Sequence, residues 1–294
     1  MSRYRYCGDS QQGKSHEVKG TVCQDAYCSR ERNGLFVTAV ADGLGSSKHS
    51  DVASKMAAYG VVDYCIANIS GKCSESSILT AIRNAFATVC QSIKDYANDC
   101  MDDYDTTLTV AVLIGGVVYF GHAGDSAIIS LRSDGIFEQV TEQQLGDGIG
   151  KDRPVYPLAA ESRWIFSKYD HRVKALFLMT DGVLNKIAPP LLEDQEYRLD
   201  HAYLYYLYDN LCKSSDLDRW ISDEVGKILP QETNFDDKTL TAVMVKYIKL
   251  KPQPLSYYRF PTEQLWGELI GRYKRELYPE KDQTPSPPVT PSDT

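Results

Sequence analysis

The 294-residue chain lacks three features that would each place it in a definite class of protein. No apolar run approaches the roughly 20 residues of a membrane-spanning helix, and the opening MSRYRYCGDS has no apolar signal core. The chain has no excess of positively charged residues, since its formal net charge is −8. None of the eight cysteines forms a CxxC pair or a zinc spacing with the five histidines. We therefore expect a soluble, cytoplasmic protein with free thiols, and neither a membrane nor nucleic acid as partner.

With 43% hydrophobic residues, the chain can bury a core of catalytic-domain size. We predict one domain over residues 1–250 and a helical extension over 251–278. The extension contains an amphipathic helix that opens near Pro261 and carries Leu265, Leu269, Tyr273 and Leu277 on one face. Residues 279–294 are rich in proline, serine and threonine and are predicted to be disordered.

The most informative stretch is the strand, turn and helix that surround Asp42. The seven residues before it are apolar and rich in β-branched side chains, which predicts a buried strand. Asp42-Gly43-Leu44-Gly45 follows, and its glycines permit a sharp turn. A helix then begins near Ser50, because apolar residues recur at three- and four-residue intervals. The predicted strand thus ends at a loop that begins with the Asp42 carboxylate.

Periodicity predicts the remaining elements in an order typical of an α+β protein. Two helices are expected over 50–69 and 76–98, followed by an antiparallel meander of four strands. A polar loop over 8–20 is expected to join two N-terminal strands. Further elements are two strands, a helical region and a last strand. The predicted strands cover 4–7, 25–29, 35–41, 107–114, 117–122, 127–132, 136–140, 164–167, 173–179 and 240–248, and the helical region covers 187–229.

Four aspartates, at positions 42, 125, 181 and 236, each lie where a predicted strand meets a turn. Turn chemistry alone also explains such residues, because aspartate bonds its own backbone and glycine supplies positive φ. Strands of one sheet or sandwich can, however, gather these ends at one edge. Carboxylates without cysteine or histidine favour Mg²⁺ or Mn²⁺. Two such ions about 3.5–4 Å apart activate water for phosphoryl displacement, which predicts a phosphate-ester hydrolase.

The order of the acidic motifs resembles that of the metal-dependent protein phosphatase family, PP2C, and most closely its bacterial branch. The resemblance spans about residues 5–248 and implies an αββα sandwich, in which two antiparallel sheets are flanked by helical pairs. It also implies hydrolysis of phosphoserine and phosphothreonine in proteins. The matching motifs are Gln24-Asp25, Asp42-Gly43-x-Gly45, Gly124-Asp125-Ser126, Thr180-Asp181-Gly182 and Asp236-Asp237-x-Thr239.

The same resemblance implies roles for individual residues. Asp42 would bridge two Mg²⁺ or Mn²⁺ ions, and the carbonyl oxygen of Gly43 would bind one of them. Asp181 and Asp236 would complete the ligands of the second ion. A water that bridges the ions would be the nucleophile, and no phosphoenzyme would form.

Two further acids would lie around this pair of ions. Asp25 would orient metal-bound water, and Asp125 would belong to a weaker third metal site. The implied partners are phosphorylated protein substrates and a cognate serine/threonine kinase system.

The sequence departs from the family directly after Asp42-Gly43, where a histidine that acts as general acid is usual. This chain has Leu44, and a general acid is typically worth about 10²–10⁴-fold in rate. His49 is predicted as the catalytic substitute, with Lys48 as the alternative, and a surface position at the start of the helix is the competing interpretation of both.

Three other positions also differ from the family pattern. Gln24 replaces an acid before Asp25, and Asn185 replaces an acid that supports the third metal. Gly20 occupies the position of a phosphate-binding arginine, for which Lys19 is the predicted substitute. His16, in the same polar stretch, is a second candidate for substrate binding.

Two alternatives to a protein phosphatase remain at this stage. A catalytically weak or inactive relative would bind phosphoproteins or a kinase as an adaptor, which the residues at 44 and 185 favour. The retained metal carboxylates favour the enzyme. A phosphatase for a small phosphorylated metabolite would have the same site residues.

Overall fold

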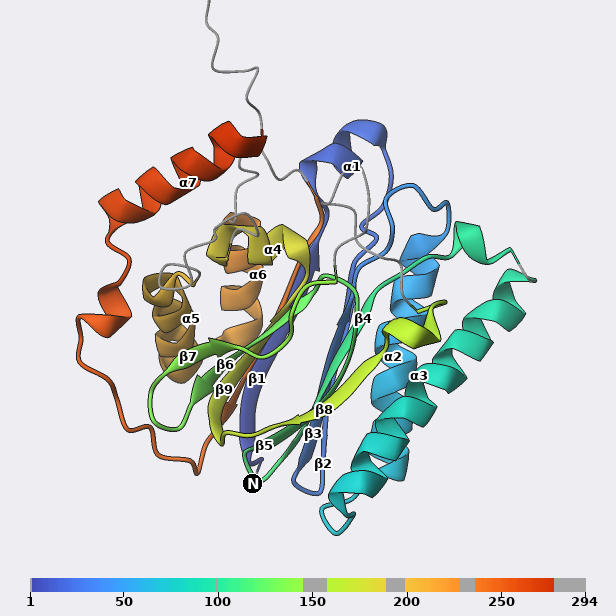
Figure 1. Ribbon diagram of the computed structural model, residues 1–294, viewed down its shortest axis with the longest axis horizontal. Coiled ribbons are helices and arrows are strands. Elements are labelled where there is room, and N and C mark those ends of the chain that lie inside the picture. Colours follow the sequence, from blue (N-terminus) through green and yellow to red (C-terminus); the bar gives the residue numbers. More distant parts are fainter. Residues whose placement is uncertain (1, 99, 145–157, 189–198, 228–235, 278–294) are drawn as a thin grey trace, which may run out of the picture.

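A computed structural model describes residues 2–98, 100–144, 158–188, 199–227 and 236–277. Two five-stranded sheets pack face to face with helices on both outer faces (Figure 1). The first sheet has the order β1-β10-β9-β6-β7 and the second β2-β3-β4-β5-β8. Every strand pair is antiparallel. This arrangement is the predicted αββα sandwich.

The strands and helices have the following bounds. The strands are β1 Tyr4–Gln11, β2 Ala26–Arg32, β3 Leu35–Ala41, β4 Leu108–Ile114, β5 Val117–Ala123, β6 Ala127–Arg132, β7 Phe137–Gln139, β8 Ile165–Tyr169, β9 Val173–Met179 and β10 Lys238–Val245. The helices are α1 Lys14–Lys19, α2 Ser50–Asn68, α3 Glu75–Ala97, α4 Asp181–Ile187, α5 His201–Lys213, α6 Leu217–Lys227 and α7 Glu263–Leu277.

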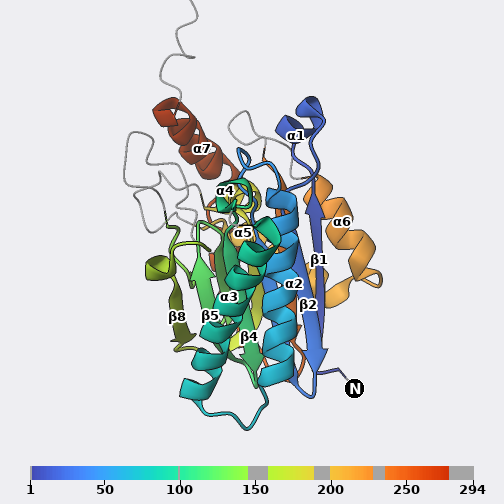
Figure 2. The same ribbon diagram turned by 90° about the vertical axis from the view of Figure 1, so that its right-hand side faces the viewer.

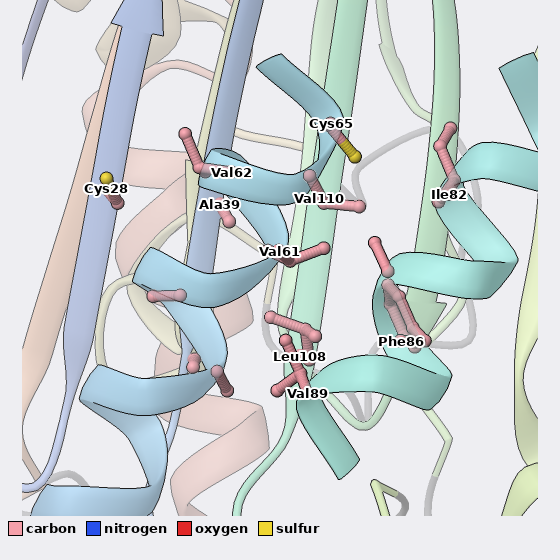
Figure 3. Close-up of a cluster of buried hydrophobic side chains, with 14 of the residues drawn as sticks. Cys28, Ala39, Val61, Val62, Cys65, Ile82, Phe86, Val89, Leu108 and Val110 are labelled. Atoms are coloured by element: carbon pink, nitrogen blue, oxygen red, sulfur yellow. The ribbon is translucent and has the colours of Figure 1, made fainter. Parts of the chain in front are cut away.

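Helices α2 and α3 cover the outer face of the second sheet, as Figure 2 shows. Small residues on α2, such as Ala57 and Ala58, are fully buried and let the helix approach the sheet closely. The apolar stripe of α3 packs beside it, and Ser74 caps that helix by accepting a hydrogen bond from Ser77 N at 3.2 Å. Figure 3 shows the resulting core, with Cys28, Ala39, Val61, Val62, Cys65, Ile82, Phe86, Val89, Leu108 and Val110 labelled.

Two further cores complete the sandwich. The layer between the sheets includes Phe36 and Val40 of β3 and Leu176 and Leu178 of β9. All seven residues of β3 are buried, because it is covered by helices on one face and by the first sheet on the other. Helices α4, α5 and α6 cover the outer face of the first sheet and form the third core. Each fully buried aliphatic or aromatic side chain contributes about 1.5–3 kcal/mol to stability.

The predicted four-stranded meander is wrong. β4 and β5 pair in the second sheet, whereas β6 and β7 pair with each other in the first. The chain crosses between the sheets at Gly124-Asp125-Ser126, where Gly124 has a φ of +124°. A turn signal of this kind indicates where a strand ends, but it does not distinguish a hairpin from a crossover.

Three local predictions also need correction. The stretch expected to be a polar loop contains the end of β1 and the short helix α1. Gly20 ends α1 in the left-handed conformation, with a φ of +68°. Asp181, expected in a turn, opens helix α4. The last strand ends at Val245, three residues earlier than predicted.

The C-terminal helix lies where the sequence indicated. α7 begins at Glu263, and Leu269 on its apolar face is buried. The division into a domain over 1–250 and an extension over 251–278 stays a prediction, and residues 279–294 lie outside the described part. Across the described ranges, no helix combines the length and apolar character needed to span a bilayer.

Candidate active site

The structure brings the five predicted aspartates together at one end of the sandwich. Asp42 directly follows β3 and Asp25 directly precedes β2 in the second sheet. Asp181 follows β9, and Asp236 lies just before β10, its neighbour in the first sheet. Asp125 lies on the crossover between the sheets. Each sheet therefore contributes acids to the same cluster.

Backbone contacts fix Asp42 and Gly43 at this end. Asp42 N donates to Thr107 Oγ1 at 2.9 Å, and Thr107 N donates to Asp42 O at 2.8 Å. Position 43 requires glycine, because a Cβ there would lie 2.6 Å from Gln24 O and 2.7 Å from Ser50 O. The tight packing of two backbones thus explains the glycine that follows the first acid.

Asp25 links the two sheets beneath the cluster. Thr180 Oγ1 donates to Asp25 Oδ2 at 2.7 Å, and Thr239 N donates to Thr180 Oγ1 at 3.0 Å. Gly182 makes the approach of α4 to this point possible, because a Cβ there would come within 1.9 Å of Asp237 O. The hydroxyl of Thr180 thus connects the Asp25 carboxylate to the start of β10.

Burial and mutual repulsion raise the pKa values of the acids. Burial is the larger cause for Asp42, and repulsion from Asp25, Asp181, Asp236 and Asp125 adds to it, so the pKa of Asp42 lies well above its ordinary value. Burial and neighbouring acids likewise raise the pKa values of Asp25 and Asp181 well above the usual range. Burial raises the pKa of Asp125 to about 6 and also raises that of Asp236. Without a bound cation, burial and mutual repulsion thus disfavour the ionised form of these acids.

Several buried oxygen atoms here have no hydrogen-bond partner within the described part of the chain. They are Asp125 Oδ1, Asp181 Oδ1, Asn185 Oδ1 and Gln24 Oε1. All four are acceptors, and a buried polar atom without a partner costs about 1–3 kcal/mol. A cation, or water held by a cation, would satisfy them.

The residues fit Mg²⁺ or Mn²⁺ by this chemistry, because oxygen ligands and negative charge are what these ions prefer. As the described side chains are placed, no group of three His, Cys, Asp or Glu lies close enough to enclose a single ion. The match to Mg²⁺ or Mn²⁺ therefore rests on the oxygen atoms of these residues and on their negative charge.

His49 and Lys48 contact residues outside the cluster of site aspartates. The His49 ring lies 5.1 Å from the Tyr104 ring, and its backbone N donates to Asp103 O at 2.9 Å. Lys48 Nζ pairs with Asp103 Oδ2 at 3.2 Å. Both side chains thus face the segment just before β4.

His16 and Lys19 lie on α1, close to the cluster. His16 is only 4% exposed, and its Nδ1 lies 2.9 Å from Asp237 Oδ2. Lys19 is exposed at the end of α1, and its charge lowers the pKa of Asp236, against the larger effect of burial. α1 therefore brings positive charge to the acidic cluster.

Asp237 was missed as a site residue. It is buried, and its carboxylate accepts from Gly13 N at 2.6 Å and from Gln24 N at 2.5 Å. Thr107 and Thr180 were also missed as anchors. The available signals were the doubled acid before the last strand, for Asp237, and the position directly before Asp181, for Thr180.

Comparison with known proteins identifies the class of molecule. A family model described as Protein phosphatase 2C matches residues 12–221, which is more than half of the chain. The chain therefore belongs to the protein phosphatase 2C family. No curated protein sequence matches it.

Solved structures share the fold at low sequence identity. The S. agalactiae serine/threonine phosphatase has a TM-score of 0.62 and 17% identity, covering 83% of this chain and 100% of that one. The Mycobacterium tuberculosis serine/threonine phosphatase PstP/Ppp has a TM-score of 0.58 and 16% identity, with coverages of 83% and 99%. PppA of Pseudomonas aeruginosa, described as a key regulatory component of T6SS, has a TM-score of 0.57 and 22% identity, with coverages of 83% and 98%.

Proposed function

We propose that this protein is a metal-dependent serine/threonine protein phosphatase. The observation that carries the proposal is the cluster of Asp25, Asp42, Asp125, Asp181 and Asp236, whose pKa values are all raised. A protein that buries like charges in this way loses stability unless a cation compensates them. Two Mg²⁺ or Mn²⁺ ions, when bound, supply a water activated at neutral pH and neutralise charge on the phosphoryl oxygens.

Each acid takes a distinct part in this proposal. Asp42 would hold both ions and the carbonyl oxygen of Gly43 one of them from the second sheet, and Asp181 and Asp236 would hold the second ion from the first sheet. Asp125 serves a weaker third position. Asp25 accepts a hydrogen bond from Thr180, and this bond joins the two sheets at the site.

The surroundings of α1 support an anionic, phosphorylated substrate. Lys19 is exposed beside the acids and is the proposed phosphate-binding residue in place of the family's arginine. The proposed substrates are phosphorylated proteins of a serine/threonine kinase system, as the descriptions of the related structures suggest.

A second candidate is a catalytically weak or inactive adaptor. Two observations favour it: the Leu44 side chain cannot donate a proton where the family has a histidine, and Asn185 is neutral where the family has an acid. PppA is described as a regulatory component, which is consistent with either role. The retention of all the metal carboxylates favours the enzyme.

Hydrolysis assays separate these candidates. Purified protein is incubated with a phosphothreonine peptide or with small sugar phosphates, each with Mn²⁺, with Mg²⁺ and with EDTA. We expect phosphate release from the peptide that depends on metal and stops in EDTA. Metal binding without turnover would support the adaptor, and release from sugar phosphates alone would identify a metabolite phosphatase.

A further inference from the structure

Hydrolysis of a serine or threonine phosphate leaves an alkoxide, which needs a proton as the ester bond breaks. The side chain that follows Asp42-Gly43 cannot supply it, because Leu44 is apolar. His49 and Lys48 face Tyr104 and Asp103 instead. A histidine on another element is therefore the stronger candidate for the proton donor of the proposed reaction.

His16 of α1 is a histidine held by a buried acid at this site. Its Nδ1 lies 2.9 Å from Asp237 Oδ2, and both side chains are almost fully buried. The atoms are close, although the N–H direction is not aligned for a hydrogen bond. Catalytic hydrogen bonds are often poorly aligned before substrate binds.

Asp237 is itself fixed by the backbone. Its Oδ1 accepts from Gly13 N at 2.6 Å and its Oδ2 accepts from Gln24 N at 2.5 Å. Gly13 immediately precedes α1, so the same carboxylate places both the start of the helix and the ring of His16. An acid that orients a histidine in this way is a recurring arrangement in catalysis.

The other nitrogen of the ring points toward the turn that follows Asp42. A Cβ built on Gly45 would lie 3.8 Å from His16 Nε2, and Gly45 is exposed. Gly45 lies two residues after Gly43, the proposed carbonyl ligand. His16 thus approaches from α1 the same turn whose third residue is the apolar Leu44. Figures 1 and 2 show α1 at the end of the sandwich where α4 also begins.

We propose that His16, oriented by Asp237, donates the proton to the leaving alcohol; this assignment rests on the proposed phosphatase function. A water oxygen forms the new P–O bond and releases a proton to solvent. The ester P–O bond breaks, its electron pair stays on the serine or threonine oxygen, and that oxygen takes the proton from Nε2. Solvent then returns a proton to the ring. His16 is the catalytic residue of the pair and Asp237 is a positioning residue.

The test uses two substrates that differ in their need for a proton. A phosphothreonine peptide releases an alkoxide, whereas p-nitrophenyl phosphate releases a stable phenolate. The kcat and KM values of the wild type, His16→Gln and Asp237→Asn are measured on both substrates with Mn²⁺. His171→Gln, at an exposed histidine between β8 and β9, is the matched control. Circular dichroism and melting temperatures verify the fold of each variant.

We expect His16→Gln to lower kcat on the peptide by about 10²-fold or more, with KM nearly unchanged, and to change kcat on p-nitrophenyl phosphate by less than about threefold. Asp237→Asn should show the same selectivity with a smaller loss, and His171→Gln should match the wild type.

An equal loss on both substrates, or no loss on the peptide, would overturn the assignment. A selective loss in His49→Gln instead of His16→Gln would transfer the role to His49. A wild type that releases no phosphate from either substrate with Mn²⁺ would refute the phosphatase function itself.

Discussion

Replacing Asp125 by asparagine should stabilise the metal-free protein. Asp125 is 4% exposed, and burial raises its pKa from 3.8 to about 6. A shift of about 2 units corresponds to about 3 kcal/mol of preference for the neutral form in the folded state. At pH 7 the carboxylate is ionised, so the folded protein carries this cost, and Asp125→Asn removes it.

The pH dependence follows from the direction of the shift. Because the folded-state pKa lies above the unfolded value, the contribution of Asp125 to stability is fully present below about pH 4 and is lost as the pH rises through about 6. In EDTA, the advantage of Asp125→Asn over the wild type should therefore be largest at pH 7–8 and should vanish near pH 4.

Thermal and urea unfolding in EDTA measure this difference. For a domain of this size, about 3 kcal/mol corresponds to an increase in melting temperature of roughly 6–12 °C at pH 7. Asp170→Asn, at an exposed position, is the control and should have no effect. Mn²⁺ should stabilise the wild type more than Asp125→Asn. A variant less stable than the wild type in EDTA at pH 7, or an advantage independent of pH, would refute the reasoning.

Three further predictions test the framework of the site. Gly182→Ala should destabilise the protein by about 1–3 kcal/mol or more, because the added Cβ would overlap Asp237 O. Gly267→Ala is the control, since a Cβ there has no atom within 4 Å and should not destabilise the protein, and urea unfolding compares the two variants. Thr180→Val removes the hydroxyl between Asp25 and Thr239, so it should lower the free energy of unfolding by about 1–3 kcal/mol and reduce activity. Thr180→Ser keeps the hydroxyl and should retain stability and activity, and equal behaviour of the two variants would contradict this. Burial lowers the pKa of His122 to about 4, so its NMR signals should not titrate between pH 8 and 5, and a midpoint near the ordinary 6.5 would be contrary evidence.

The sequence predicted the local unit around Asp42 well, because its signals are local. An apolar β-branched run, an Asp-Gly turn and a helical stripe each reflect a periodicity that survives in the fold, and β3 matches the expected bounds. The gathering of the acids at one end also followed from their positions at strand ends.

Other features depended on contacts between distant segments. The turn at Gly124 resembles a hairpin in sequence, and only the packing of two sheets makes it a crossover. The pairing of His16 with Asp237 joins residues more than two hundred positions apart, so no local pattern could indicate it. The same is true of Thr180, whose role depends on Asp25 in the other sheet.

The most direct test of the account is phosphate release from a phosphothreonine peptide with Mn²⁺ by the wild type, Asp42→Asn and Asp181→Asn. Both variants remove a charge from the acidic cluster and should remain folded, which circular dichroism verifies. We predict turnover by the wild type and its loss in both variants. Equal turnover by all three proteins would contradict a reaction at this cluster, and the absence of turnover in the wild type would contradict the proposed phosphatase.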